Sequence, residues 1–201
     1  MSEKFSDLVE TTFRWPSRGD RLFVDAGHRM DQAEIHSEAD ARSYFMTDGY
    51  KRAADLLVEK AIENRFERNR LVYPILFCYR QFIELSLKGQ ISAYGTYVGV
   101  DLPTKQTHDL RVLLKRYRRM CLRFAPGDMA PMIVVSKCIL EFARMDATSF
   151  TFRYATAKSG APYPVLTDRL DLERLRDTME GMGDFFSGSD GYYTSLIDAG
   201  P

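Results

Sequence analysis

The stretch from Asn69 to Gly95 constrains the fold more than any other part of this sequence. Its apolar residues surround the helical wheel and leave no wide polar arc, and a helix that is apolar nearly all round is a buried one. We therefore expect one long central helix, against which the other helices pack. The apolar positions are Ile75, Leu76, Phe77, Cys78, Tyr79, Phe82, Ile83, Leu85, Leu87 and Ile91.

Three charged residues interrupt this apolar helix, namely Arg80, Glu84 and Lys88. Residues four apart share one face of a helix, so Glu84 can pair with the Arg before it and the Lys after it. Phe77 and Leu87 fall on the same strip, which predicts that the charges are held inside the fold as a specified polar site. The alternative is an ordinary exposed row of ion pairs, which contributes little to stability.

The remaining pattern predicts an all-α protein, an antiparallel four- to five-helix bundle with a short β-hairpin before the last helix. Apolar periodicity predicts the other helices at about 43–65, 108–124, 129–144 and 171–186. Alternating aromatics at 149–155 and a turn at 158–162 predict the hairpin, with 163–166 as its returning strand. The expected organisation is an N-terminal extended arm at 1–42, the bundle at 43–187 and a flexible tail at 188–201.

The helix expected at 108–124 has an apolar inner face and a basic outer face, and Thr107 is its expected N-cap. A surface helix normally interleaves Glu with its Lys and Arg, and this one does not. We therefore predict that the outer face binds RNA or another polyanion, the alternative being an ordinary solvated face. Its cations are Arg111, Lys115, Arg116, Arg118, Arg119 and Arg123.

The rest of the composition limits the class of protein. The chain has 28 basic and 28 acidic residues, so no global basicity points to nucleic acid. The N-terminus lacks the apolar core of a signal peptide, and no window is long and apolar enough to span a membrane, so we expect a soluble cytoplasmic protein. The three Cys are widely spaced in apolar surroundings, as expected of reduced core residues. The three His have no partners at metal-ligand spacing, so we expect no metal site and no cofactor.

Three segments in a fixed order resemble the HEPN-like helical domains of prokaryotes. They are R-Q-F-I-E-L-S-L-K at 80–88, T-H-D-L-R-V-L-L at 107–114 and D-A-T-S-F-T-F-R-Y at 146–154, and the likeness spans about 43–186. The resemblance implies a helical bundle, a homodimer, and a metal-independent ribonuclease or RNA-binding module of a toxin–antitoxin, phage-defence or RNA-processing system. The sequence departs from active members because no Arg-x(4–6)-His motif lies near the last helix. That spacing recurs only in the N-terminal arm, from Arg21 to His28 and from Arg29 to His36.

His108 is the one His within the HEPN-like region, so any cleavage chemistry there centres on it. Metal-independent RNA cleavage needs an acid or base near the 2′-OH and a cation for the developing phosphorane charge. We predict that His108 converges with Arg80, Glu84 and Arg153 as the candidate catalytic residues. The surrounding polar network is expected to contain Lys88, Asp109, Asp146 and Tyr154.

Simpler structural roles stay open for the same residues. The ring of His108 would then hydrogen-bond in the core at the start of a helix, and Asp109 would interact with the helix dipole. Arg153 and Tyr154 would anchor the hairpin to the Glu84 side of the bundle.

Two functions follow from this pattern. The first is a HEPN-like RNA-associated protein of a defence or toxin–antitoxin system, extending to metal-independent endoribonuclease activity. The alternative is a non-catalytic structural or interaction subunit, whose polar row specifies the fold and whose basic face binds an acidic protein partner. A third hypothesis, a small-molecule pocket lined by Tyr79, Tyr94 and the hairpin aromatics, has no ligand indicated by the sequence.

Overall fold

The computed structural model describes residues 16–24, 32–127 and 130–200, and the chain divides into two units, Met1–Ile35 and His36–Pro201. In the first unit the described residues form only turns, bends and irregular backbone. Residues 1–15 and 25–31 of the predicted N-terminal arm, which include His28 and Arg29, lie outside the described residues.

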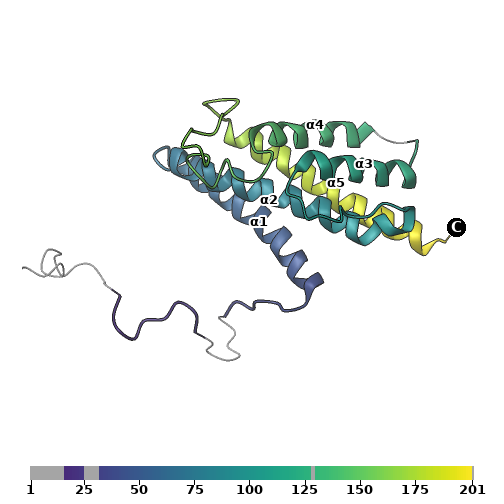
Figure 1. Cartoon of the computed structure of the whole chain (residues 1–201), viewed down its shortest axis with the longest axis horizontal. Helices are drawn as coiled ribbons and strands as arrows, with labels where there is room; N and C mark the ends of the chain where they lie inside the picture. Colours follow the sequence, from purple (N-terminus) through teal and green to yellow (C-terminus); the bar gives the residue numbers. More distant parts are fainter. Residues whose placement is uncertain (1–15, 25–31, 128–129, 201) are drawn as a thin grey trace, which may run out of the picture. The chain divides into compact units, whose positions relative to one another are not determined.

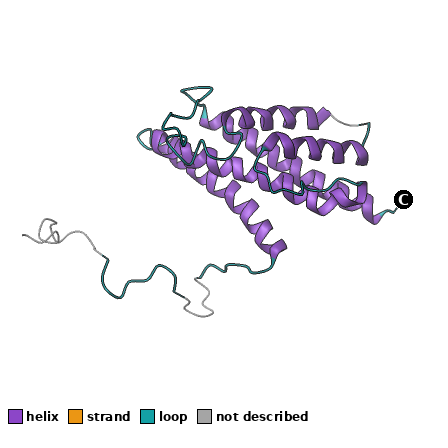
Figure 2. Ribbon diagram, in the orientation of Figure 1, coloured by secondary structure: helices purple, strands orange, loops and turns teal. Residues whose placement is uncertain are grey.

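The described residues of the second unit are helical apart from their connections, which confirms the all-α prediction (Figures 1 and 2). Each helix expected from the apolar periodicity is present, with ends that differ by at most about four residues, except that the last helix is much longer than expected. The antiparallel order of the helices stays a prediction. The elements are α1 (Ala39–Glu63), α2 (Arg68–Tyr94), η2 (Gly95–Val98), α3 (Leu110–Phe124), α4 (Ala130–Met145) and α5 (Leu172–Asp198).

Helix α2 contacts α1, α3 and α5, while α4 packs on α3 and α5. Helix α2 begins at Arg68 and continues through Pro74 without a break. Every residue of α2 from Ile75 to Ile91 is buried or half-buried, so this part of the helix is covered on nearly every side, as its sequence predicts. Burial of an Ile or Leu side chain stabilises the fold by about 1.5–3 kcal/mol.

The predicted β-hairpin is not formed. The described residues between α4 and α5 contain no strand, and their one β-type contact is an isolated antiparallel bridge between Thr156 and Pro162. The expected turn at 158–162 is present, with Gly160 in the left-handed region at a φ of 82°. The aromatic segment before it is a turn, because the backbone N–H groups of Phe150 and Thr151 donate to the side chain of Asp146. These bonds use donors that a strand would have offered to a partner.

Helix α5 is longer than the sequence predicts. We expected it to end near Phe186, with a frayed tail, but it continues to Asp198. Tyr193 is buried there, with its hydroxyl donating to Cys121 Sγ and its ring packed against Phe124. This packing keeps the glycine-containing final turns helical, which is a common case of tertiary contact overriding propensity.

The connection from α2 to α3 positions the basic helix. A Cβ at Gly95 would lie 1.9 Å from the carbonyl oxygen of Val100, so the chain needs glycine at this close approach. The N-cap of α3 is Asp109, whose side chain accepts from the N–H of Arg111 at 2.8 Å. Thr107 was the expected cap, but its hydroxyl accepts from the N–H of Asp109 and so braces the true cap.

Across the described parts of the chain, no helix combines the length and the apolar character that crossing a membrane requires.

Candidate functional site

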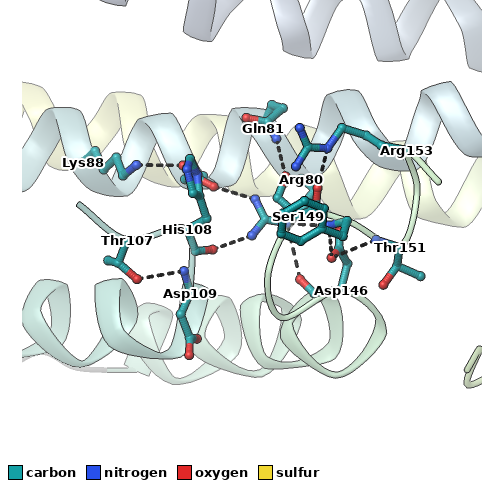
Figure 3. Close-up of polar contacts among 12 residues, drawn as sticks. Arg80, Gln81, Lys88, Thr107, His108, Asp109, Asp146, Ser149, Thr151 and Arg153 are labelled. Atoms are coloured by element: carbon teal, nitrogen blue, oxygen red, sulfur yellow. Dashed lines mark hydrogen bonds and ion pairs between the residues drawn. The ribbon is translucent and has the colours of Figure 1, made fainter. Parts of the chain in front are cut away.

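Arg80 is the largest fully buried side chain among the described residues. Its Nη1 donates to Glu84 Oε2 at 2.6 Å, and its Nη2 donates to the carbonyl oxygen of His108 at 2.5 Å. Its Nε donates to the carbonyl oxygen of Asp146 at 3.3 Å. A buried guanidinium needs such partners, since isolated charge in the interior is very costly. Arg80 therefore connects α2 with the backbone that enters α3 and the backbone that leaves α4 (Figure 3).

Glu84 is also buried, and three side chains pair with its two carboxylate oxygens. Besides the guanidinium on Oε2, its Oε1 lies 2.7 Å from Lys88 Nζ and 2.8 Å from His108 Nδ1. Burial raises the pKa of Glu84, but the hydrogen bonds and charges of Lys88 and Arg80 outweigh it and hold that pKa below the ordinary value of 4.5. Glu84 is thus an ionised carboxylate at neutral pH.

His108 connects this buried network to solvent. Its side chain is 61% exposed, although its Nδ1 is paired with the buried carboxylate of Glu84. A carboxylate beside Nδ1 favours the tautomer with a proton on Nδ1, so that Nε2 carries the free lone pair. No described residue bonds to Nε2. Lys88 is the next most accessible member, with 27% of its side chain exposed.

Asp146 extends the network from the end of α4 into the following loop. Its Oδ1 accepts from the N–H groups of Phe150 at 2.9 Å and Thr151 at 3.3 Å. Its Oδ2 lies 3.4 Å from Arg80 Nε but accepts no hydrogen bond, because that N–H is directed at the Asp146 carbonyl oxygen. The carboxylate therefore balances the charge of Arg80 while it fixes the loop.

Two polar residues near this site were not anticipated from the sequence. Gln81 Nε2 donates to Ser149 Oγ at 2.8 Å, which ties the loop after α4 to α2. Ser149 is buried and has a φ of 68°, an unusual conformation for a residue other than glycine. A polar residue directly after Arg80, on the core helix, was the available signal for Gln81. Nothing local in the sequence marks Ser149.

Arg153 and Tyr154 lie beside the network rather than in it. Arg153 Nε donates to the carbonyl oxygen of Ser149, and its guanidinium lies over the rings of Phe77, Phe150 and Tyr154 at 5.9, 5.0 and 5.6 Å from their centroids. Neither residue contacts Glu84 or His108. The structure thus brings His108, Arg80 and Glu84 together, whereas Arg153 lies apart from them, over the Phe77 ring of α2.

The basic face of α3 separates into two groups. The exposed side chains of four cations have no hydrogen bond or ion pair with any described residue, and we call them the free basic face: Arg111, Lys115, Arg118 and Arg119. Arg116 Nη1 instead donates to the carbonyl oxygen of Asp101, and Arg123 Nη1 donates to those of Val98 and Gly99. These two Arg residues fasten α3 to the preceding loop, so they are not part of the free face.

This arrangement orients one exposed imidazole at the start of a basic helix. The buried pair of Arg80 and Glu84 fixes both the backbone and the ring of His108, while Asp109 caps the helix that follows. An imidazole held by a buried carboxylate is suited to proton transfer. The described residues contain no group of three or more His, Cys, Asp or Glu side chains that could hold a metal ion.

The lowered pKa of Glu84 predicts how stability depends on pH. Because the folded pKa lies below the unfolded value, the contribution of Glu84 is fully present above the unfolded pKa and is lost as pH falls through the folded one. We expect the melting-temperature difference between wild type and Glu84→Gln to be constant near neutral pH and to shrink below about pH 4.5. Thermal unfolding across an acid pH series measures this difference. A difference that stays constant into strong acid would contradict the assignment.

The chain matches no family model, no curated protein and no solved structure.

Proposed function

We propose that this chain is a HEPN-like RNA-associated protein of a prokaryotic defence or toxin–antitoxin system, acting in the cytoplasm. The observation that carries the RNA-binding part is the free basic face of α3, whose first cation, Arg111, comes three residues after His108. Four exposed cations without acidic partners form a site for the phosphates of a nucleic-acid backbone. The HEPN-like identity, the biological setting and a homodimeric state come from the sequence resemblance at 80–88, 107–114 and 146–154.

The site also supports a proposal of metal-independent RNA cleavage. His108 Nε2 would take the proton of a 2′-OH, the 2′-oxygen would bond to phosphorus, and the bond from phosphorus to the 5′-oxygen would break. The leaving oxygen would take its proton from water. Lys88 Nζ would stabilise the phosphorane charge, since it is partly exposed and pairs with the same Glu84 oxygen as His108. Arg80 and Glu84 are positioning residues in this proposal, because their buried side chains do not reach a bound strand.

A second candidate function is a non-catalytic subunit that binds an acidic protein partner through the same basic face. The observation that favours it is the complete burial of Arg80, because a buried ion network serves to specify a fold as well as to orient a catalytic group.

Incubation with total RNA in EDTA separates the two functions. We expect wild type to cleave RNA and His108→Ala to cleave it about 10²–10⁴ times more slowly, the usual effect of removing an acid–base group. His108→Ala should bind RNA as wild type does, because its side chain is not part of the free basic face. Equal cleavage by both proteins would exclude His108 as the catalytic group. Binding without any cleavage would leave an RNA-binding module, and absence of binding would favour the protein-partner function.

A further inference from the structure

An exposed aromatic cluster lies beside the polar site and has no role in the network. The rings of Phe150 and Tyr154 are 43% and 54% exposed, and their centroids lie 5.9 Å apart with 31° between the ring planes. Arg153 lies over both rings. We call Phe150, Arg153 and Tyr154 the aromatic platform.

The local backbone holds the platform in a fixed arrangement. The N–H groups of Arg153 and Tyr154 both donate to the carbonyl oxygen of Phe150 at 3.1 Å, which places the two rings, four residues apart, on the same side of a turn. Arg153 Nε is bonded to the Ser149 carbonyl, and the Asp146 carboxylate binds the N–H of Phe150. Rings that are already ordered lose little conformational entropy when a ligand stacks on them.

The platform lies near His108 along α2. Figure 3 shows Arg153 on one side of Arg80 and His108 on the other, with Gln81 and Lys88 as the nearby positions of α2. Gln81 and Lys88 are seven residues apart, which corresponds to about 10 Å along the axis of α2. This length equals roughly three steps of a stacked nucleotide strand. Asp146 contacts both the platform and Arg80, so the two parts are built on one support.

We propose that the aromatic platform stacks unpaired bases, so that the RNA bound by this protein is single-stranded next to His108. This inference rests on the proposed RNA-binding function and names its substrate class. Single-stranded RNA offers splayed bases that stack on aromatic and Arg side chains, whereas the bases of a duplex are stacked inside it and cannot reach such a surface. The free basic face binds the backbone of either form, so the platform supplies the discrimination.

The test compares fluorescence-anisotropy titrations with a short labelled oligouridine and with a fully paired RNA duplex of the same length. We expect wild type to bind the single strand more tightly than the duplex. Tyr154→Leu, which keeps an apolar side chain but removes the ring, should weaken single-strand binding about tenfold, as base stacking predicts, and leave duplex binding unchanged. Tyr154→Phe should bind like wild type, because stacking uses the ring and not the hydroxyl.

Tyr73→Leu is the matched control, since Tyr73 is a 55% exposed tyrosine of α2 that has no ring contact among the described residues. It should leave both affinities unchanged, and the melting temperatures of all variants should match that of wild type. Equal binding of single strand and duplex, with no effect of Tyr154→Leu, would overturn the single-strand inference and leave the proposed function in place. Absence of binding to either RNA, with intact folding, would overturn the proposed function and this inference with it.

Discussion

Arg80→Ala is expected to destabilise this protein by about 3–5 kcal/mol, the usual cost of removing one partner of a buried ion network. The substitution leaves the carboxylate of Glu84 with one partner fewer in a buried position and removes the charge that faces Asp146. It also leaves the carbonyl oxygen of His108 without its donor. For a domain of this size, such a change lowers the melting temperature by on the order of 10 °C.

Arg52→Ala is the appropriate control for this loss. Arg52 also faces a carboxylate four residues away along its helix, Asp48, but the two side chains are 77% and 47% exposed and 3.9 Å apart. Exposed pairs of this kind contribute about 0–1 kcal/mol. Differential scanning calorimetry of both variants tests the comparison, and equal melting temperatures would show that the Arg80 network does not support the fold. Arg80→Met, which keeps most of the volume, separates the loss of charge from the loss of packing.

Neutralising the free basic face is expected to remove most of the RNA affinity while leaving the fold intact. For single-stranded RNA, each cation that contacts a phosphate contributes about 0.7 to the slope of log affinity against log salt, so four contacts contribute about 3. Wild-type affinity should therefore fall roughly 50-fold between ~50 and ~200 mM salt through these contacts. The variant should bind weakly and with a correspondingly shallow slope. It carries Arg111→Gln, Lys115→Gln, Arg118→Gln and Arg119→Gln.

A control variant must change the net charge equally at other places. Exposed arginines of α1, α2 and α5 serve this purpose because they lie outside α3. If the control loses as much affinity as the α3 variant, binding depends on overall charge and not on the free basic face. An unchanged salt slope in the α3 variant would equally contradict the proposed surface. The control carries Arg42→Gln, Arg52→Gln, Arg70→Gln and Arg174→Gln.

The buried ion network was predictable because its spacing is local. Arg80, Glu84 and Lys88 lie four residues apart, and the apolar residues around them show that their face is covered. Asp109 was recognised as a candidate of the helix start, although Thr107 was preferred as the cap. Both residues suit that position, and the sequence does not reveal which backbone N–H groups their side chains will meet.

Contacts between distant residues were not predictable in the same way. The alternation of aromatics at 149–155 is typical of a strand, yet the Asp146 side chain competes for the same backbone donors and closes a turn. Gln81 and Ser149 are 68 residues apart, and no periodicity links them. The position of Arg153 was mispredicted for the same reason. In a hairpin its side chain would have had different neighbours from those that it has in the turn.

The length of α5 sets a limit on shortening the chain. Every residue proposed for RNA binding, proton transfer or base stacking precedes α5. A protein that ended at Phe186 would therefore still contain all of these residues. It would nevertheless lose Tyr193, whose ring fills space against Phe124 and whose hydroxyl meets Cys121 on the inner side of α3. The terminal turns thus brace the helix that carries the free cations, although they contribute nothing that a ligand would touch.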